Sequence, residues 1–291
     1  MNAILVTGKN GQLGEALQTV LAPLGRVIAL GRNELDLADA EAIRTTIRAA
    51  APAIIVNAAA YTAVDKAESE PALAMQVNAV APGVMAEEAL RIGALLVHFS
   101  TDYVFDGTKT SPYVEDDLPR PISIYGQSKL EGERAVAATG CRHLILRTSW
   151  VYSAGHVNFV TTMLRLAQER RELSVVNDQI GSPTWAKPLA QATADLLRKT
   201  QALPEVRDLF HLSAGGGVSR YALVRKIMEL ARQPDDHKSW AKIHPTTTAE
   251  YPLPAARPLM TVLNNDKIKR VYGIAMPGWE TQLAAFLSAP G

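Results

Sequence analysis

Short apolar runs separated by helix-length stretches most constrain how this chain can fold. The strand candidates are Ala3–Val6, Val27–Leu30, Ile54–Val56, Leu95–Phe99 and Leu144–Leu146. They are nearly continuous hydrophobic runs, as expected of parallel strands that are covered on both faces. The expected helices between them are Gln12–Leu21, Ala40–Ala50, Pro71–Ile92 and Tyr125–Ala138. This alternation predicts an α/β fold with a Rossmann-type, doubly wound parallel sheet.

A glycine-rich turn follows the first predicted strand and opens the first predicted helix. Its pattern is Gly-x-x-Gly-x-x-Gly, formed by Gly8, Gly11 and Gly14. Residues without a Cβ let the backbone approach a pyrophosphate, and the free N–H groups of a helix N-terminus attract the anion. The context favours nucleotide binding over a tight turn without a ligand.

The residue after the second strand helps to decide between NADH and NADPH. An acidic residue there binds the ribose hydroxyls, whereas an arginine accommodates a 2′-phosphate. Here Gly31 and Arg32 follow the strand, and the next carboxylate is Glu34. The pattern favours NADPH or tolerance of both cofactors, with a solvated surface arginine as the structural alternative.

After Arg147 the alternation of strands and helices loosens. We expect residues 1–148 to form the dinucleotide-binding domain and residues 149–291 to form mainly a smaller C-terminal substrate-binding lobe. Strands near 173–176 and 208–212 should return to the main sheet. Further helices are expected at Asn158–Arg171, Lys187–Lys199 and Ser219–Ala231, and the proline-rich stretch His244–Pro258 should be mostly loop.

Composition narrows the class of protein. The chain has 291 residues, of which 47% are hydrophobic and 20% charged, and its net charge is +1. Without a long basic run we expect no nucleic-acid partner, and without an apolar stretch of ~18 residues we expect no membrane span. The single cysteine, Cys141, fits a reducing cytoplasm, and the N-terminus shows no signal-peptide pattern. The spacing of the histidines predicts no metal site.

Tyr125 is the only one of the eight tyrosines with a lysine four positions on, at Lys129. On a helix this spacing places both side chains on one face. We expect the ammonium to favour the phenolate and to lower the tyrosine pKa, so that the phenol can exchange a proton with a carbonyl oxygen.

Hydroxyl and carboxylate groups stand where the fourth predicted strand ends. Thr101 there would lie over the cofactor crevice and could bond a substrate oxygen next to Tyr125; its structural alternative is a cap at the strand exit. His98 alternates onto the face opposite Phe99, which favours a core histidine over a catalyst.

These features resemble the extended short-chain dehydrogenase/reductase superfamily and, more closely, the dTDP-4-dehydrorhamnose reductase family. The segments that carry the resemblance are Gly8–Gly14, Val56–Glu68, Ser100–Phe105, Tyr125–Lys129, Arg147–Tyr152 and Asn177–Thr184. The resemblance implies NAD(P)H-dependent reduction of the C4 keto group of dTDP-4-dehydro-β-L-rhamnose to dTDP-β-L-rhamnose. It also implies a dTDP-sugar as the partner and allows a homodimer.

The resemblance assigns roles by position. Tyr125, Lys129 and Thr101 would be catalytic, and Thr101, Asp102 and Trp150 would bind substrate. The cofactor would contact Gly8, Gly11, Gln12, Leu13, Gly14, Arg32, Asp36, Leu37, Ala59, Ala60, Tyr61, Thr62, Tyr125 and Lys129. Asn78 could order a proton path, or bond backbone as an ordinary helix asparagine. A phosphate role for Arg257 competes with that of a solvated arginine.

Two rival functions and one departure from the family stay open. A related dehydratase would carry a second acid after Asp102, where this chain has Tyr103, and an epimerase would retain its cofactor. A non-catalytic regulatory subunit is the rival from another class. Some family members are described as metal-dependent, but Lys187 stands where a carboxylate ligand would be sought, so we expect no metal.

Overall fold

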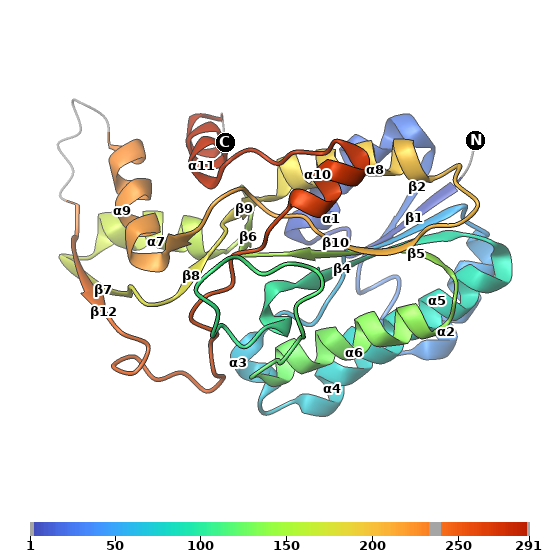
Figure 1. Cartoon of the computed structure of the whole chain (residues 1–291), viewed down its shortest axis with the longest axis horizontal. Helices are drawn as coiled ribbons and strands as arrows, with labels where there is room; N and C mark the ends of the chain where they lie inside the picture. The colour runs from blue at the N-terminus through green and yellow to red at the C-terminus, as the bar shows by residue number, and fades with distance from the viewer. Residues whose placement is uncertain (1–2, 233–239, 290–291) are drawn as a thin grey trace.

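A parallel sheet forms the centre of the protein in this computed structural model, which describes residues 3–232 and 240–289 (Figure 1). Its six strands lie in the order β10-β5-β4-β3-β1-β2, and every neighbouring pair is parallel. They are β1 (Ala3–Thr7), β2 (Arg26–Leu30), β3 (Ile54–Asn57), β4 (Leu95–Thr101), β5 (Arg142–Thr148) and β10 (Arg207–His211). The strand order reverses at β1, so a crevice is expected outside the carboxyl ends of β1 and β3. The predicted doubly wound sheet is confirmed.

Helices cover both faces of this sheet, as Figure 1 shows. On one face lie α1 (Gln12–Leu21), α8 (Ala186–Thr200) and α10 (Asp266–Tyr272). On the other lie α2 (Ala40–Ala50), α5 (Ala81–Ile92) and α6 (Ile124–Ala138). Alternate strand residues serve the two cores: Ile4 and Val6 face α1, whereas Leu5 faces α2 and α5.

The segment predicted as one helix over Pro71–Ile92 is interrupted. It consists of α4 (Pro71–Met75), a π-helical turn η2 (Gln76–Val80) and α5. Such turns often occur at functional sites. Here the turn carries Asn78, whose side-chain amide bonds both backbone polar groups of Tyr61 and the Ser128 hydroxyl.

The second half of the chain forms a smaller lobe beside the sheet and also returns elements to it. β10 pairs with β5, as predicted for 208–212. The expectation that 173–176 returns to the main sheet is wrong, because β7 (Glu172–Val176) pairs instead with β12 (Lys242–Thr246). The stretch His244–Pro258 therefore begins in a strand rather than being entirely loop. Two further short pairs are β6 (Val151–Tyr152) with β9 (Thr184–Trp185) and β8 (Ile180–Gly181) with β11 (Val218–Ser219).

The remaining elements lie mostly around the second lobe and the sheet edge. They are η1 (Ala22–Leu24), α3 (Val64–Ala67), η3 (Asp102–Val104), α7 (Phe159–Glu169), α9 (Arg220–Ala231) and α11 (Trp279–Ser288). α7 begins at a capping box in which Asn158 and Thr161 bond each other's backbone N–H groups. Tyr152, Val160, Leu223 and Leu283 meet in the core of this lobe.

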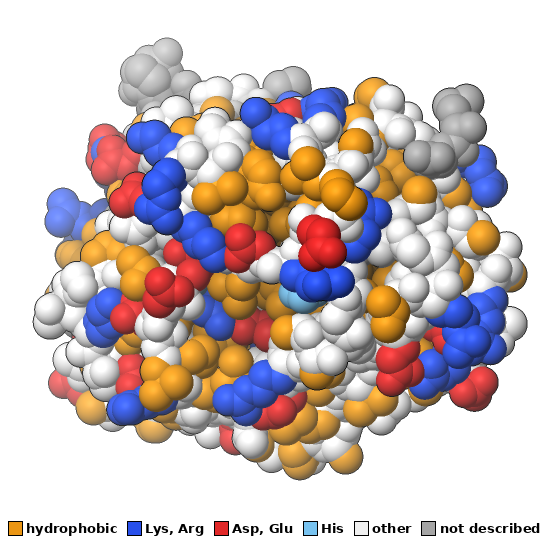
Figure 2. Space-filling model, turned by 45° about the vertical axis from the view of Figure 1, so that its right-hand side comes forward, with side chains coloured by type: hydrophobic (Ala, Val, Ile, Leu, Met, Phe, Trp, Pro, Cys, Tyr) orange, Lys and Arg blue, Asp and Glu red, His pale blue; other side chains and the backbone are white. Residues whose placement is uncertain are grey.

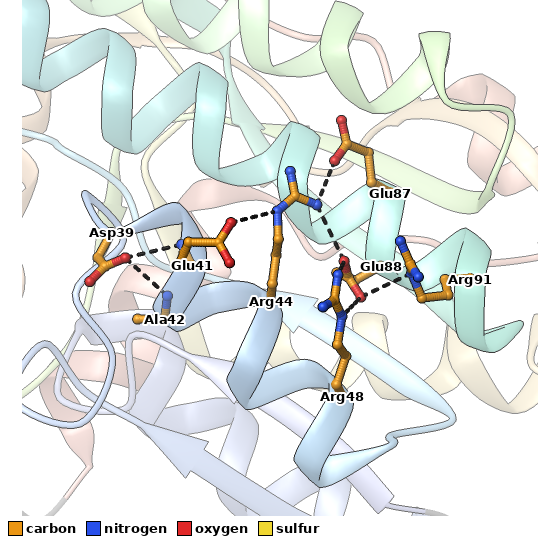
Figure 3. A network of polar contacts seen from close by, with 8 residues as sticks. All are labelled: Asp39, Glu41, Ala42, Arg44, Arg48, Glu87, Glu88 and Arg91. Carbon is orange, nitrogen blue, oxygen red and sulfur yellow. Dashed lines mark hydrogen bonds and ion pairs between the residues drawn. The ribbon is translucent and has the colours of Figure 1, made fainter.

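A buried carboxylate joins α2 to α5 (Figure 3). The Glu88 side chain is fully buried, and it accepts hydrogen bonds from Arg48 at 2.6 and 2.8 Å and from Arg44 at 3.2 Å. The Arg48 hydrogen bonds are the main cause that lowers the pKa of Glu88. The carboxylate is thus held ionised against the cost of burial.

A second buried pair joins α6 to β5. Arg147 donates from Nε and Nη2 to the two carboxylate oxygens of Glu133, at 2.8 and 2.6 Å. Ser100 on β4 donates to the same carboxylate. The bidentate pair fixes the helix that carries Tyr125 and Lys129 against the central strands.

Candidate active site

The glycine loop has the geometry of an anion-binding turn. Gly8 has a positive φ of 77°, and a Cβ on Gly14 would lie only 1.9 Å from the Gly8 carbonyl oxygen. The N-cap of α1 is Gly11, which supplies no side-chain cap, so the first N–H groups of the helix are not capped by that residue. Glycines therefore let the loop fold onto a helix start that can receive a phosphate.

A cavity of about 720 Å³ lies at the carboxyl edge of the sheet, between the glycine loop and the second lobe. Predicted site residues that line it are Gly8, Gly11, Gln12, Leu13, Arg32, Ala59, Ala60, Thr62, Thr101, Asp102, Tyr125, Lys129 and Trp150. Two sequence motifs that lie far apart in the chain, the glycine loop and the Tyr125–Lys129 pair, thus open onto one space.

Four predicted cofactor residues lie outside this lining. Gly14 is buried beneath the loop and acts through its shape. Asp36 lies in an exposed turn, where its carboxylate accepts from the Ala38 N–H, and Leu37 is buried in the core against α2. The Tyr61 hydroxyl donates to Glu70 at 2.6 Å.

The end of β2 presents a cation to the cavity. Arg32 is exposed and lines the cavity. The nearby carboxylate of Glu34 is engaged by Lys9 at 2.5 Å and by the Gly31 N–H at 2.9 Å. Because the Glu34 carboxylate is already bonded, the end of β2 resembles a site that accommodates a 2′-phosphate more than one that binds ribose hydroxyls.

Two glycines let α6 press onto its neighbours and so place Tyr125 and Lys129. A Cβ on Gly126 would lie 2.2 Å from the Tyr103 carbonyl oxygen, and one on Gly132 would lie 2.1 Å from that of Asn78. Ser123 caps the helix by accepting from the Gly126 N–H. These glycines therefore let α6 carry Tyr125 and Lys129 close to η3 and η2.

The expected lowering of the Tyr125 pKa is wrong for this structure. Burial raises the pKa of the phenol far above its ordinary value; a hydrogen bond with Thr101 lowers it, and the negative charge of Asp102 raises it further. The Lys129 amine is directed elsewhere, donating to the Phe99 carbonyl at 2.6 Å. Burial also lowers the pKa of Lys129 to about 8. Desolvation outweighs the charge effect expected from the four-residue spacing.

Asp102 stands beside Thr101 at the end of β4. Burial raises the pKa of its carboxyl to about 6, against hydrogen bonds with Thr261, Ser149 and Thr101 that lower it. The Ser149 hydroxyl donates to it at 2.9 Å. The Asp102 carboxyl is therefore a polar group of the cavity lining that can take up a proton just below neutral pH.

Trp150 and a residue missed by the sequence reasoning, Arg220, form the opposite wall. Trp150 has a positive φ of 45°, and its indole fills the space that a Cβ on Gly181 would enter at 2.4 Å. The Arg220 guanidinium lies 4.1 Å from the Trp150 ring centroid. Arg220 begins α9, far along the chain from Trp150. The only sequence signal near it was Ser219, which predicted the start of a helix but not a site residue. Arg257, in contrast, forms an ion pair with Asp65 at 2.7 Å.

Two residues that line this cavity carry hydroxyls without partners. The hydroxyls of Thr148 and Tyr152 are buried without a hydrogen-bond partner, and both residues line the cavity. Buried hydroxyls are normally bonded, so these two fit a polar ligand. Together with the glycine cradle and Arg32, they make the cavity suitable for a dinucleotide and a sugar.

Acidic and basic side chains intermingle on the face shown in Figure 2.

Within residues 3–232 and 240–289 there is no group of three or more His, Cys, Asp or Glu side chains that could hold a metal ion. Over the same residues, no helix is long and apolar enough to cross a membrane.

Comparison with known proteins places these features in one family. The family model described as "RmlD substrate binding domain" matches residues 1–290. A dTDP-4-dehydrorhamnose reductase from Burkholderia thailandensis is 46% identical over 282 residues, covering 95% of each chain. A crystal structure of a dTDP-4-dehydrorhamnose reductase from Clostridium acetobutylicum superposes with a TM-score of 0.90, 36% identity and 98% coverage of both chains. Another, from Bacillus anthracis in complex with NADP, has a TM-score of 0.88, 36% identity and the same coverage.

Proposed function

Because this chain belongs to the dTDP-4-dehydrorhamnose reductase family, we propose that it reduces the C4 keto group of dTDP-4-dehydro-β-L-rhamnose to give dTDP-β-L-rhamnose, with NADPH as reductant. One observation carries the proposal. A single cavity brings the glycine loop at the end of β1 together with Tyr125, Lys129 and Thr101. A cofactor site and a proton donor must share one space if hydride and proton are to reach the same carbonyl.

The cofactor end of the cavity suits NADPH. The uncapped N–H groups at the start of α1 would receive the pyrophosphate, and Arg32 would face the 2′-phosphate. When bound, NADPH supplies the hydride. Ala59, Ala60 and Thr62 line the cavity near the carboxyl end of β3 and would hold the nicotinamide side.

Tyr125 is the proposed proton donor to the C4 oxygen. Burial keeps its phenol protonated, so the group enters the reaction with a proton to give. Thr101 hydrogen-bonds the phenol and would orient the carbonyl oxygen beside it. Lys129 lies four residues on along α6 and would bind the ribose hydroxyls and stabilise the phenolate formed after transfer.

The second lobe would bind the rest of the nucleotide sugar. Asp102 and Trp150 line the cavity on the sugar side. Arg220 brings a cation to the same wall, where the diphosphate of dTDP needs one. The hydroxyls of Thr148 and Tyr152 would find partners in the bound ligand.

A spectrophotometric assay tests the proposal. Purified protein with dTDP-4-dehydro-β-L-rhamnose should oxidise NADPH in proportion to the dTDP-β-L-rhamnose formed, with product identity checked by NMR. Protein that carries stoichiometric NAD and converts the sugar without net cofactor consumption would indicate an epimerase or dehydratase. Failure to oxidise NADPH with any dTDP-4-keto sugar, together with stable co-purification of another enzyme, would indicate a regulatory subunit.

Two expectations stay predictions. A homodimer is tested by light scattering of the purified chain, where a monomer mass would contradict it. A cytoplasmic location is tested by fractionation of cells that express the chain.

A further inference from the structure

A ladder of buried polar side chains runs from the site lysine into the sheet. The Lys129 amine lies 3.4 Å from His98 Nε2, and His98 Nδ1 lies 3.1 Å from the amide nitrogen of Asn57. The Asn57 oxygen accepts from the Thr7 hydroxyl at 2.7 Å. Each of these four side chains is at most 2% exposed.

The backbone register explains why these residues meet. Thr7 pairs with Asn57 across β1 and β3, and Asn57 pairs with His98 across β3 and β4. They therefore lie side by side on one face of the sheet. Lys129 comes onto the end of this row from α6, and Thr7 directly precedes the glycine loop.

In this arrangement, the hydrogen-bond donors and acceptors around His98 determine which ring nitrogen carries the proton. The Asn57 side chain lies with its oxygen toward the Thr7 hydroxyl, from which it accepts, and with its amide nitrogen toward His98 Nδ1. An amide nitrogen can only donate, so Nδ1 must accept and the imidazole proton must lie on Nε2. Burial, together with the charge of Lys129, keeps the pKa of His98 well below its ordinary value, so the ring carries only that one proton.

The Nε2–H group then points at the Lys129 amine. An ammonium has only donors, so it would oppose this N–H, whereas a neutral amine has a lone pair that accepts it. The ammonium form requires the reverse order: the proton on Nδ1, Nε2 accepting, and the Asn57 amide turned so that its oxygen faces His98. Thr7 would then have to reorient its hydroxyl.

We propose that His98 is a positioning residue for Lys129, and that the Thr7–Asn57–His98 ladder sets the charge of Lys129 through the His98 tautomer. The inference rests on the proposed function, because that function gives Lys129 its role in proton transfer. It links the residue that precedes the glycine loop to the charge of Lys129, which lines the same cavity as Tyr125.

Other ionisable groups lie near the ladder. Each of them either has a hydrogen-bond partner of its own or is present in both charge states of Lys129. Glu133 raises the pKa of Lys129 and is itself held by Arg147, while His143 on β5 lowers the pKa of His98. Tyr125 and Asp102 line the same cavity as Lys129. The hydrogen bonds that distinguish one charge state of Lys129 from the other are those of the ladder.

NMR of the full chain labelled with 15N-histidine tests the inference without any ligand. Nitrogen shifts and couplings distinguish the tautomers, and the His98 signal is assigned by its loss in His98→Gln or, if that variant does not fold, by elimination with the other histidines. We expect the Nε2–H tautomer at high pH and the Nδ1–H tautomer once Lys129 is protonated. One unchanged tautomer across that titration would overturn the proposal.

Kinetics provide the second arm. In wild type a limb of the pH profile of kcat is expected near pH 8, the pKa of Lys129. His98→Gln should move this limb upward by about one pH unit, because a glutamine amide can turn to accept from the ammonium. A uniform loss of kcat with an unmoved limb would show a merely structural role and overturn the proposal.

His211→Gln, at a buried histidine bonded instead to the Tyr113 carbonyl, is the matched control. If wild type reduces no dTDP-4-keto sugar, the proposed function fails while the NMR arm still decides the ladder.

Discussion

Arg147 and Lys129 are both buried cations near the carboxyl edge of the sheet, but their hydrogen-bond partners differ in charge. Arg147 makes a bidentate pair with the carboxylate of Glu133. The hydrogen bonds of the Lys129 amine go to neutral groups, the Phe99 carbonyl and the His98 ring. A guanidinium keeps its charge whatever its partner, and its bidentate pair with a carboxylate holds two elements together. A cation held by neutral dipoles can change its charge, as chemistry at this site requires.

The largest expected effect comes from Tyr125→Phe. Loss of the phenolic proton should lower kcat by about 10²–10⁴-fold, because general acid catalysis contributes on that scale. The free energy of unfolding and the Kd for NADPH should change little. Tyr272→Phe, on α10 and away from the cavity, is the control and should retain wild-type turnover. Near-normal turnover in Tyr125→Phe would refute its role.

Arg147→Met removes the cation that is paired with a buried carboxylate. Removing one partner leaves the Glu133 carboxylate buried without its charge partner, so the free energy of unfolding should fall by about 3–5 kcal/mol. Denaturant titration measures this change. Arg134→Met is matched, because Arg134 pairs with Glu131 on the exposed face of the same helix and should cost less than about 1 kcal/mol. Equal effects of the two variants would contradict this distinction.

Glu88→Gln tests a second locked charge, and its effect should depend on pH. The lowered pKa of Glu88 means that its stabilisation is fully present at neutral pH and is lost as pH falls below the ordinary carboxyl pKa of ~4.3. The variant should be less stable by about 1–3 kcal/mol at pH 7. The difference should close in acid, as followed by denaturant titration at several pH values. Glu87→Gln, at the more exposed neighbour paired with Arg44, should show little change at any pH.

Lys129→Met should change stability much less than Arg147→Met does. The pKa of about 8 means that the buried ammonium costs stability below pH 8, by roughly 3 kcal/mol, and that this cost disappears as pH rises toward ~10.4. Methionine removes the cost but forfeits hydrogen bonds worth about 1–3 kcal/mol. The free energy of unfolding at pH 7 should therefore stay within about 1 kcal/mol of wild type while turnover is lost. A drop as large as that of Arg147→Met would contradict the comparison.

The parts of the fold that local patterns encode could be predicted from the sequence. Buried parallel strands read as continuous apolar runs, and the glycine loop and the Tyr125–Lys129 pair are short motifs. The partner of β7 could not be predicted in this way, because β12 lies far along the chain and pairing depends on the tertiary fold. The π-helical turn was not predicted either; it lies where Gly132 packs against the Asn78 carbonyl, a long-range contact that no local pattern shows.

In the site, too, the residues that belong to local motifs could be predicted, and those brought in by the tertiary fold could not. The predicted residues that line the cavity come from the glycine loop, the strand ends and α6, whereas the lining from the second lobe, including Arg220, was largely not predicted. The pKa of Tyr125 was expected in the wrong direction because charge spacing is visible in a sequence and desolvation is not. Asp36, Leu37 and Tyr61 stay predictions as cofactor contacts, since they lie outside the cavity lining.

Titration of the Lys129 amine distinguishes a cation that can change its charge from one that cannot. The amine can be followed by NMR in protein labelled with 15N-lysine, with its signal assigned by its absence in Lys129→Met. An amine held by neutral partners should gain its proton near pH 8. A midpoint at or above the ordinary lysine value of ~10.4 would show that burial among neutral partners does not free Lys129 to change its charge, contrary to the comparison with Arg147.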